Sequence, residues 1–142
     1  MKHALAAGLA LASLIGTPAW AAQGFKPTEV YKGSKDLRGQ DIQYPQGKPE
    51  VTSMRVAIDP GGEGDLHQHP VPAYIYVLEG SLTVEFADGS QRSFQAGQGF
   101  LEVVNTTHKA RNLGSARLQF LVVFVGAEGM PNIVSPEPQA GN

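Results

Sequence analysis

Three histidines have the side-chain type and spacing that could support metal chemistry: His67, His69 and, later in the chain, His108. Side chains two residues apart in a strand point to the same face, so the imidazoles of His67 and His69 can converge on one ion. Neutral imidazole nitrogens bind divalent transition metals. The three histidines therefore predict a divalent metal site, with Fe, Zn, Mn, Ni and Cu all open as its occupant.

Glu102 is an acid between apolar neighbours, Leu101 and Val103. If its side chain points inward, it could be a fourth metal ligand or a catalytic general base whose pKa is raised by burial. If it points outward, it would pair with a lysine or arginine on the exterior of the domain. Strand alternation does not decide between these alternatives, because the neighbours of Glu102 on both faces are apolar.

Composition excludes several other kinds of chemistry. The chain has no cysteine, so neither a cysteine nucleophile nor a disulfide is available. The metal pattern uses every histidine except His3, which leaves no histidine for a Ser-His-Asp arrangement. No cluster of basic residues occurs and the formal net charge is −2, so a nucleic-acid partner is not expected.

The N-terminus has the features of a secretory signal peptide over residues 1–21. Lys2 supplies a positive charge, an apolar run follows, and Ala19-Trp20-Ala21 is a small-x-small cleavage signal. The apolar run is shorter than the roughly 20 residues needed to span a bilayer. We therefore expect export to the periplasm, or secretion, and no membrane attachment after cleavage.

The remaining chain consists of short strand-like runs. Residues alternate between apolar and polar as in half-buried strands, and Asp88-Gly89 is a hairpin-turn signal. This pattern predicts an all-β domain over residues 50–130, preceded by an N-terminal arm at 22–49 and followed by a flexible tail at 131–142. The strand candidates are Ser53–Ile58, Tyr74–Leu78, Leu82–Ala87, Gln91–Gln95, Phe100–Val104, Lys109–Asn112 and Arg117–Val125.

The last of these runs is apolar on both strand faces from Leu118 to Val125, with Gln119 as the exception. A strand buried on both faces would explain this composition. The alternative is that the second face is covered by another copy of the chain, in a homodimer.

Around the histidines, the chain resembles a single-domain cupin. The family's first motif, G-x5-H-x-H-x3-4-E-x6-G, and its second, G-x5-P-x-G-x2-H-x3-N, both have counterparts between about Val51 and Gly126. The matching residues are Gly61, His67, His69 and Gly80 for the first motif, and Gly97, His108 and Asn112 for the second. The resemblance implies a double-stranded β-helix, or jelly roll, with the three histidines as metal ligands on its inner face and Asn112 in a structural hydrogen-bonding role.

The chain departs from the family pattern at three positions. Val103 replaces the proline and Asn105 the glycine of the second motif. Asparagine tolerates a positive φ better than most residues, so the turn can be kept. Ala73 replaces the glutamate of the first motif and removes a metal ligand, and Tyr74 beside it should point to the opposite face.

For function, the resemblance implies a metal-binding cupin that acts on a small molecule by dioxygenase, isomerase or lyase chemistry. Three neutral imidazoles leave the positive charge of the ion uncompensated, which favours an anionic or oxygen-rich ligand. The alternative is a non-catalytic cupin that binds a small molecule or metal, or one whose metal site is vestigial. Fold alone does not choose between these functions.

Overall fold

The computed structural model describes residues 24–136, so the predicted signal peptide at 1–21 lies outside the described residues. Within this range, no helix is long and apolar enough to cross a membrane. The named elements are seven strands: β1 (Pro49–Ile58), β2 (Ala73–Glu79), β3 (Ser81–Phe86), β4 (Gln91–Gln95), β5 (Gly99–Leu101), β6 (His108–Arg111) and β7 (Leu118–Ala127). Each strand falls on one of the strand candidates of the sequence.

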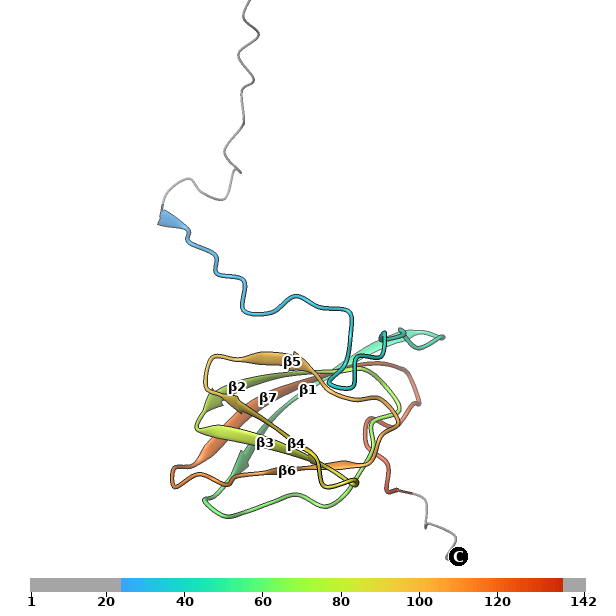
Figure 1. Ribbon diagram of the computed structural model, residues 1–142. Helices are drawn as coiled ribbons and strands as arrows, with labels where there is room; N and C mark the ends of the chain where they lie inside the picture. Colours follow the sequence, from blue (N-terminus) through green and yellow to red (C-terminus); the bar gives the residue numbers. More distant parts are fainter. Residues whose placement is uncertain (1–23, 137–142) are drawn as a thin grey trace, which may run out of the picture.

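The strands form two antiparallel sheets that face each other (Figure 1). One sheet has the order β1-β7-β2-β5 and the other β4-β3-β6. Strands that are neighbours in a sheet are often distant in the chain, as β1 and β7 are. This is the jelly-roll arrangement, and the predicted all-β double-stranded β-helix is confirmed.

The core lies between the inner faces of the two sheets. Alternate residues of β2, β3 and β7 point into it and are almost fully buried, as the alternating sequence runs predict. The largest of these side chains include Ile75, Val77, Leu82, Val84, Phe120 and Phe124.

Strand β1 behaves differently from the other strands of its sheet. Its inward residues Met54, Val56 and Ile58 pair with β7 but are only partly buried or, for Met54, 37% exposed. The interior is therefore open along β1, and the pocket described below lies there.

Two residues of the predicted motifs fix the ends of strands. Gly80 joins β2 to β3 with φ at +76°, and a Cβ there would lie 2.6 Å from the carbonyl oxygen of Arg117, so only glycine fits. Asn112 is fully buried, and its Nδ2 donates to the carbonyl oxygens of Ile58 and Ala116 at 2.9 and 2.8 Å. The predicted structural role of Asn112 is confirmed.

Before β1 begins at Pro49, the described part of the N-terminal arm has no named strand, only an isolated bridge between Lys35 and Asp41. Leu37 packs against the core, and the Arg38 guanidinium lies 4.1 Å from the ring centroid of Phe86. Arg38 also pairs with Asp88 at 2.7 Å. The arm thus lies against the domain next to the β3–β4 hairpin.

The segment after Met130 differs from the flexible tail expected from Pro131 onward. Val134 and Gln68 exchange two backbone hydrogen bonds of 2.9 Å, which form an isolated antiparallel bridge. The expectation is wrong for this part of the tail, because its backbone pairs with the strand-like segment that carries His67 and His69. Residues 137–142 of the predicted tail lie outside the described range.

Burial along β7 also differs from a strand covered on both faces. Its inward residues are buried, whereas Leu121, Val123 and Val125 on the other face are only partly buried. The interpretation of full burial is therefore wrong for the single chain. The homodimer alternative stays a prediction.

Candidate metal centre

The three predicted histidines lie together on the inner face of the barrel. The ring centroids are 4.8 Å apart for His67 and His69, 4.6 Å for His67 and His108, and 5.0 Å for His69 and His108. One ligand nitrogen from each lies within 4.8 Å of the other two. His69 and His108 are buried, and His67 is partly buried.

Backbone pairing explains why these side chains meet. His67 and His108 exchange two backbone hydrogen bonds, His67 N to His108 O at 2.9 Å and His108 N to His67 O at 3.0 Å. Residues paired in this way project their side chains from the same face of the sheet. His69 shares that face because it lies two residues after His67.

The hydrogen bonds of the rings set which nitrogen is available to an ion. The Nδ1 atoms of His67, His69 and His108 each lie 2.8 Å from a backbone carbonyl oxygen, those of Asp65, Asn132 and Thr106 respectively. A carbonyl oxygen only accepts, so each Nδ1 carries the proton and donates it. In the neutral rings, all three Nε2 atoms then have a free lone pair, as a metal ligand requires.

Glu102 points inward, to the same place as the three rings. It is 7% exposed, and its carboxylate oxygens lie 3.2 Å from His108 Nε2 and 3.5 Å from His69 Nε2. The alternative of an exterior position paired with a lysine or arginine is therefore wrong. The alternation gave no signal because Leu101 and Val103 are both buried.

The position of Glu102 is directly related to that of Ala73. Strands β2 and β5 pair in register through Tyr74 with Leu101 and Ile75 with Phe100, and Glu102 N donates to Ala73 O at 2.9 Å. Glu102 thus continues the pairing opposite Ala73, and directly opposite residues share a face. Glu102, the residue directly after β5, therefore supplies a carboxylate to the same inner face as Ala73.

The predicted rise in the pKa of Glu102 does not occur. Burial opposes ionisation of this carboxyl group, but its polar contacts with His108 and His69 outweigh burial and lower its pKa to about 2. The pKa of His108 is raised, because the contact with Glu102 outweighs the effect of burial. The pKa of His67 is lowered, mainly by burial. Glu102 is therefore an anion at neutral pH.

The arrangement suits a metal ion. His108 Nε2 is buried and has no hydrogen-bond partner among the described residues, although a carboxylate oxygen lies 3.2 Å away. A lone pair and an anionic oxygen repel each other unless a cation, either a proton or a metal ion, lies between them. Three imidazole nitrogens and one carboxylate form a donor set that suits several divalent transition metals.

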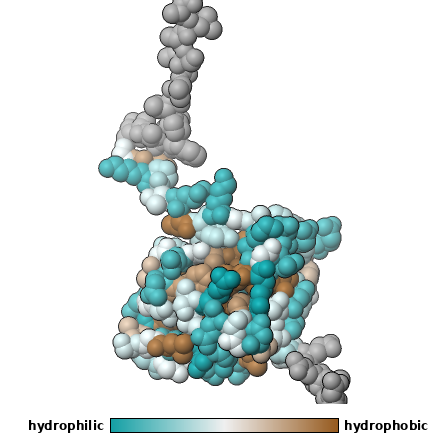
Figure 2. Space-filling model, in the orientation of Figure 1, coloured by the Kyte–Doolittle hydropathy of each residue, from teal (hydrophilic) through white to brown (hydrophobic). Residues whose placement is uncertain are grey.

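A pocket of about 520 Å³ leads to these residues. One wall is β1 with Met54 and Val56, a second is β7 with Phe120 and Val122, and the loop at 59–64 forms a third. His67, His69 and Glu102 lie at the pocket's polar end, and most of the remaining lining is apolar. Viewed from one side, hydrophilic residues cover much of the exterior, and apolar residues are visible between them, some of them in the middle of this face (Figure 2).

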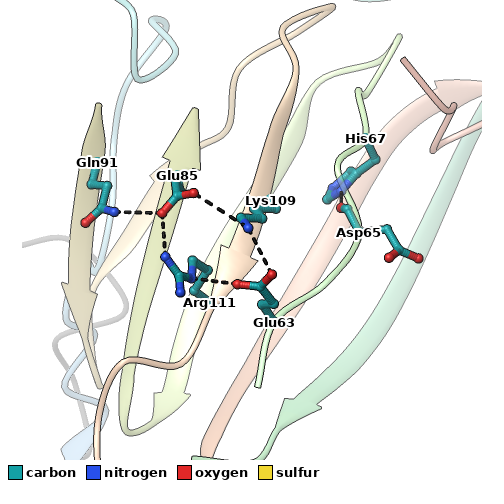
Figure 3. A network of polar contacts seen from close by, with 7 residues as sticks. All are labelled: Glu63, Asp65, His67, Glu85, Gln91, Lys109 and Arg111. Atoms are coloured by element: carbon teal, nitrogen blue, oxygen red, sulfur yellow. Dashed lines mark hydrogen bonds and ion pairs between the residues drawn. The ribbon is translucent and has the colours of Figure 1, made fainter. Parts of the chain in front are cut away.

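Ion pairs hold the loop that precedes His67. Glu63 pairs with Lys109 at 2.9 Å and with Arg111 at 2.8 Å, and both cations also contact Glu85 on β3 (Figure 3). Gly64 N donates to Ala110 O at 2.9 Å, so the loop runs beside β6 in the manner of a further strand. Asp65, whose carbonyl accepts from the His67 ring, follows at once. Glu63 is exposed, and its carboxylate is bound in this network.

The sequence did not reveal the role of Asn132. Its carbonyl oxygen orients the His69 ring from 63 positions further along the chain, whereas the acceptors for His67 and His108 lie two residues before each ring. Ile133, the next residue, lines the pocket. We call residues 131–134 the C-terminal strap. A backbone carbonyl carries no side-chain signal, so only the fold identifies this contact.

The sequence over residues 54–124 matches the cupin domain family. This match covers half of the chain and coincides with the barrel and its histidines, and the chain belongs to the cupin family. No curated protein matches the chain.

Solved structures of three cupin enzymes are similar to this chain. For the oxalate decarboxylase of Lactobacillus farciminis, solved as a formate complex, identity is 28% and the TM-score 0.52, over 60% of this chain and 26% of that one. An oxalate oxidase in complex with the substrate analogue glycolate has 27% identity and a TM-score of 0.51, over 59% of this chain and 45% of that one. The oxalate decarboxylase of Bacillus subtilis, which has Mn(II) centres, has 30% identity and a TM-score of 0.50, over 60% of this chain and 23% of that one. The chain thus spans less than half the length of each protein.

Proposed function

We propose that this chain is a metal-dependent cupin enzyme that acts on a small, oxygen-bearing molecule by dioxygenase, isomerase or lyase chemistry. The main observation is the convergence of three unprotonated Nε2 atoms and one carboxylate at the end of a pocket. The similar structures are oxalate decarboxylases and an oxalate oxidase, one in complex with formate, one with glycolate and one with Mn(II) centres, which supports metal-dependent chemistry on a small carboxylate.

We assign His67, His69, His108 and Glu102 as the ligands of one divalent ion. When bound, such an ion acts as a Lewis acid that binds and polarises an oxygen atom of the substrate. The role of the three histidines is to keep their Nε2 lone pairs directed at one point, since each Nδ1 proton is engaged by a carbonyl oxygen. Both oxygens of Glu102 face imidazole nitrogens, which supports a ligand role more than a free general base.

The apolar walls of the pocket have a second role. They limit the access of water to the polar end, so electrostatic interactions there are stronger than in bulk solvent. A substrate held by one oxygen-bearing group at the ion would be oriented by its contacts with β1 and β7. Orientation of this kind is a substantial part of catalysis on small molecules.

Metal analysis of protein purified without chelator tests the site. We expect one divalent transition metal per chain, lost in His67→Ala, and turnover of at least one member of a panel of phenolic and keto acids. Oxygen uptake separates dioxygenase from isomerase or lyase chemistry. Stoichiometric metal without turnover would support the non-catalytic alternative, and the absence of metal from both the native chain and His67→Ala would support a vestigial site.

The proposed location is the periplasm. The support is the leader pattern in residues 1–21 of the sequence. Cell fractionation followed by N-terminal sequencing should find the protein outside the cytoplasm with Ala22 as its first residue. Recovery from the cytoplasm with Met1 retained would contradict this location.

A further inference from the structure

The lining of the pocket carries information about the substrate beyond the metal site. Apolar side chains of Met54, Val56, Phe120 and Val122 line the same pocket as His67, His69 and Glu102. No lysine or arginine is among the described residues that line it, and Asp59 and Glu63 at its loop wall are acids. Away from the ion, the pocket thus offers an apolar surface and no positive charge.

The charge of the proposed site sets a limit on the charge of the substrate. A divalent ion, three neutral imidazoles and one ionised carboxylate have a net charge of +1. One negative charge on the substrate neutralises this sum. A second negative charge would lie in an apolar pocket without a cationic partner, where an unpaired charge is costly.

The size of the pocket shows what can accompany the charged group. Its volume of about 520 Å³ is within the usual range of ligand pockets and much larger than a single carboxylate requires. If apolar substrate atoms fill the remaining volume, the apolar surfaces of both the substrate and the pocket are removed from water. This burial is the main source of affinity in pockets of this composition.

We infer that the substrate is a monoanion with one oxygen-bearing group for the ion and an apolar body that lies along β1 and β7. The inference rests on the proposed metal-binding function and narrows it to a substrate class. An aliphatic monocarboxylate of medium length is the simplest probe with these properties. A dicarboxylate of the same length differs from it only by a second charge at the far end.

Calorimetric titration of the Zn²⁺-loaded protein with acetate, butyrate, hexanoate and octanoate tests this class. We expect affinity to rise about fourfold for each added methylene group until the pocket is full, because each buried methylene contributes about 0.8 kcal/mol. Adipate has the same number of carbons as hexanoate and should bind at least about tenfold more weakly, because its second carboxylate has no partner.

Two substitutions on β1 distinguish an effect of charge inside the pocket from a general effect of added charge on the protein. Met54 faces the pocket, and Val51 is on the opposite face of β1 and 64% exposed. Met54→Glu should weaken octanoate binding by about tenfold or more and leave acetate binding nearly unchanged. Val51→Glu should leave both unchanged.

The possible outcomes distinguish this inference from the function on which it rests. A chain that takes up no divalent transition metal, whether Zn²⁺, Mn²⁺, Fe²⁺, Ni²⁺ or Cu²⁺, would overturn both. Stoichiometric Zn²⁺ with an affinity that does not depend on chain length, or with adipate bound as tightly as hexanoate, would overturn the substrate class alone. Equal effects of Met54→Glu and Val51→Glu would also overturn it, because only Met54 lines the pocket.

Discussion

Glu102 lies directly across the β2–β5 strand pair from Ala73, and its backbone nitrogen donates to the carbonyl oxygen of Ala73 at 2.9 Å. The position at which cupins usually have a glutamate thus has no ligand side chain, and the residue opposite it, directly after β5, has the carboxylate. Both positions face the interior, since opposite residues of an antiparallel pair project to the same side. A donor set that is incomplete in one motif is completed from another segment of the chain.

Moving the carboxylate back across the strand pair should restore metal binding. Glu102→Ala should lower metal affinity by about tenfold or more. Even the loss of a residue that only hydrogen-bonds to a metal ligand lowers affinity by about this much, and Glu102 is proposed as a ligand itself. The double variant Ala73→Glu with Glu102→Ala should recover most of the loss. Competition with a chromophoric chelator measures both affinities.

Glu79→Ala is the matched control for this experiment, because Glu79 is on β2 like Ala73 but is exposed, and among residues 24–136 its side chain is bound to Gln119 alone. It should leave the affinity unchanged. Glu102→Gln adds a further distinction: full metal content without turnover would assign Glu102 as a general base instead of a ligand, and unchanged metal content and turnover would remove it from the site.

Metal affinity should fall as the pH is lowered, beginning above the ordinary imidazole pKa of 6.5. Metal binding requires unprotonated Nε2 atoms, and Glu102 raises the pKa of His108 above its ordinary value, so a proton competes for the same position. We expect the apparent Kd to rise about tenfold for each pH unit below the pKa of His108, by ordinary proton competition. Chelator titrations between pH 5 and 8 would show this, and stoichiometric metal after dialysis at pH 4 would contradict it.

Acid stability of the metal-free protein follows from the carboxylate. The pKa of Glu102 is about 2 in the folded chain, compared with an ordinary value of 4.5, so the unfolded chain binds a proton at a higher pH than the folded one. The stability that Glu102 contributes is present above about pH 4.5 and is lost as the pH falls toward 2. Glu102→Gln should reduce this pH dependence in denaturation curves, and an unchanged dependence would assign it to other groups.

Removal of the C-terminal strap should weaken the metal site. A chain that ends at Met130 lacks the Asn132 carbonyl that orients His69, and we expect a loss of about 10- to 100-fold in metal affinity. A chain that ends at Pro136 keeps the strap and is the control. Visible spectra of the Co²⁺ forms report the ligand geometry independently of folding. Equal affinities and spectra for the two truncations would show that the strap does not position His69.

Asn105 should tolerate glycine better than alanine. It is the single non-glycine residue with a positive φ, +51°, among residues 24–136, and its backbone nitrogen donates to His69 O at 2.8 Å. Asn105→Ala should cost about 1 kcal/mol in the free energy of unfolding, whereas Asn105→Gly should be near neutral. Denaturant titration measures both, and equal costs would show that the backbone conformation is not what selects asparagine.

Features that depend on local chemistry were predictable from the sequence. The short strand-like runs located all seven strands, with β4 at the predicted bounds, and alternation marked β1 and β3 most clearly. The spacing of His67 and His69 predicted a shared face, and the tolerance of asparagine for positive φ predicted the turn at Asn105. These properties belong to single residues or to near neighbours.

Features that depend on contacts between distant segments were not predictable. The direction of Glu102 depends on the register of β5 against β2, and its low pKa depends on His69 and His108, which no alternation reports. The strap joins Val134 to Gln68 through backbone atoms alone. The sequence also could not predict which face of β7 is only partly buried, because apolar residues occur on both of its faces.

The strap also has a consequence for the order of events during synthesis. The chain is made from its N-terminus, and the His69 ring acquires its acceptor only when Asn132 has emerged and docked. A complete metal centre therefore cannot precede the folding of nearly the whole domain, and ions that meet the growing chain find an unfinished site. The metal that fills it would then reflect the supply in the compartment where folding ends as much as the preference of the ligands.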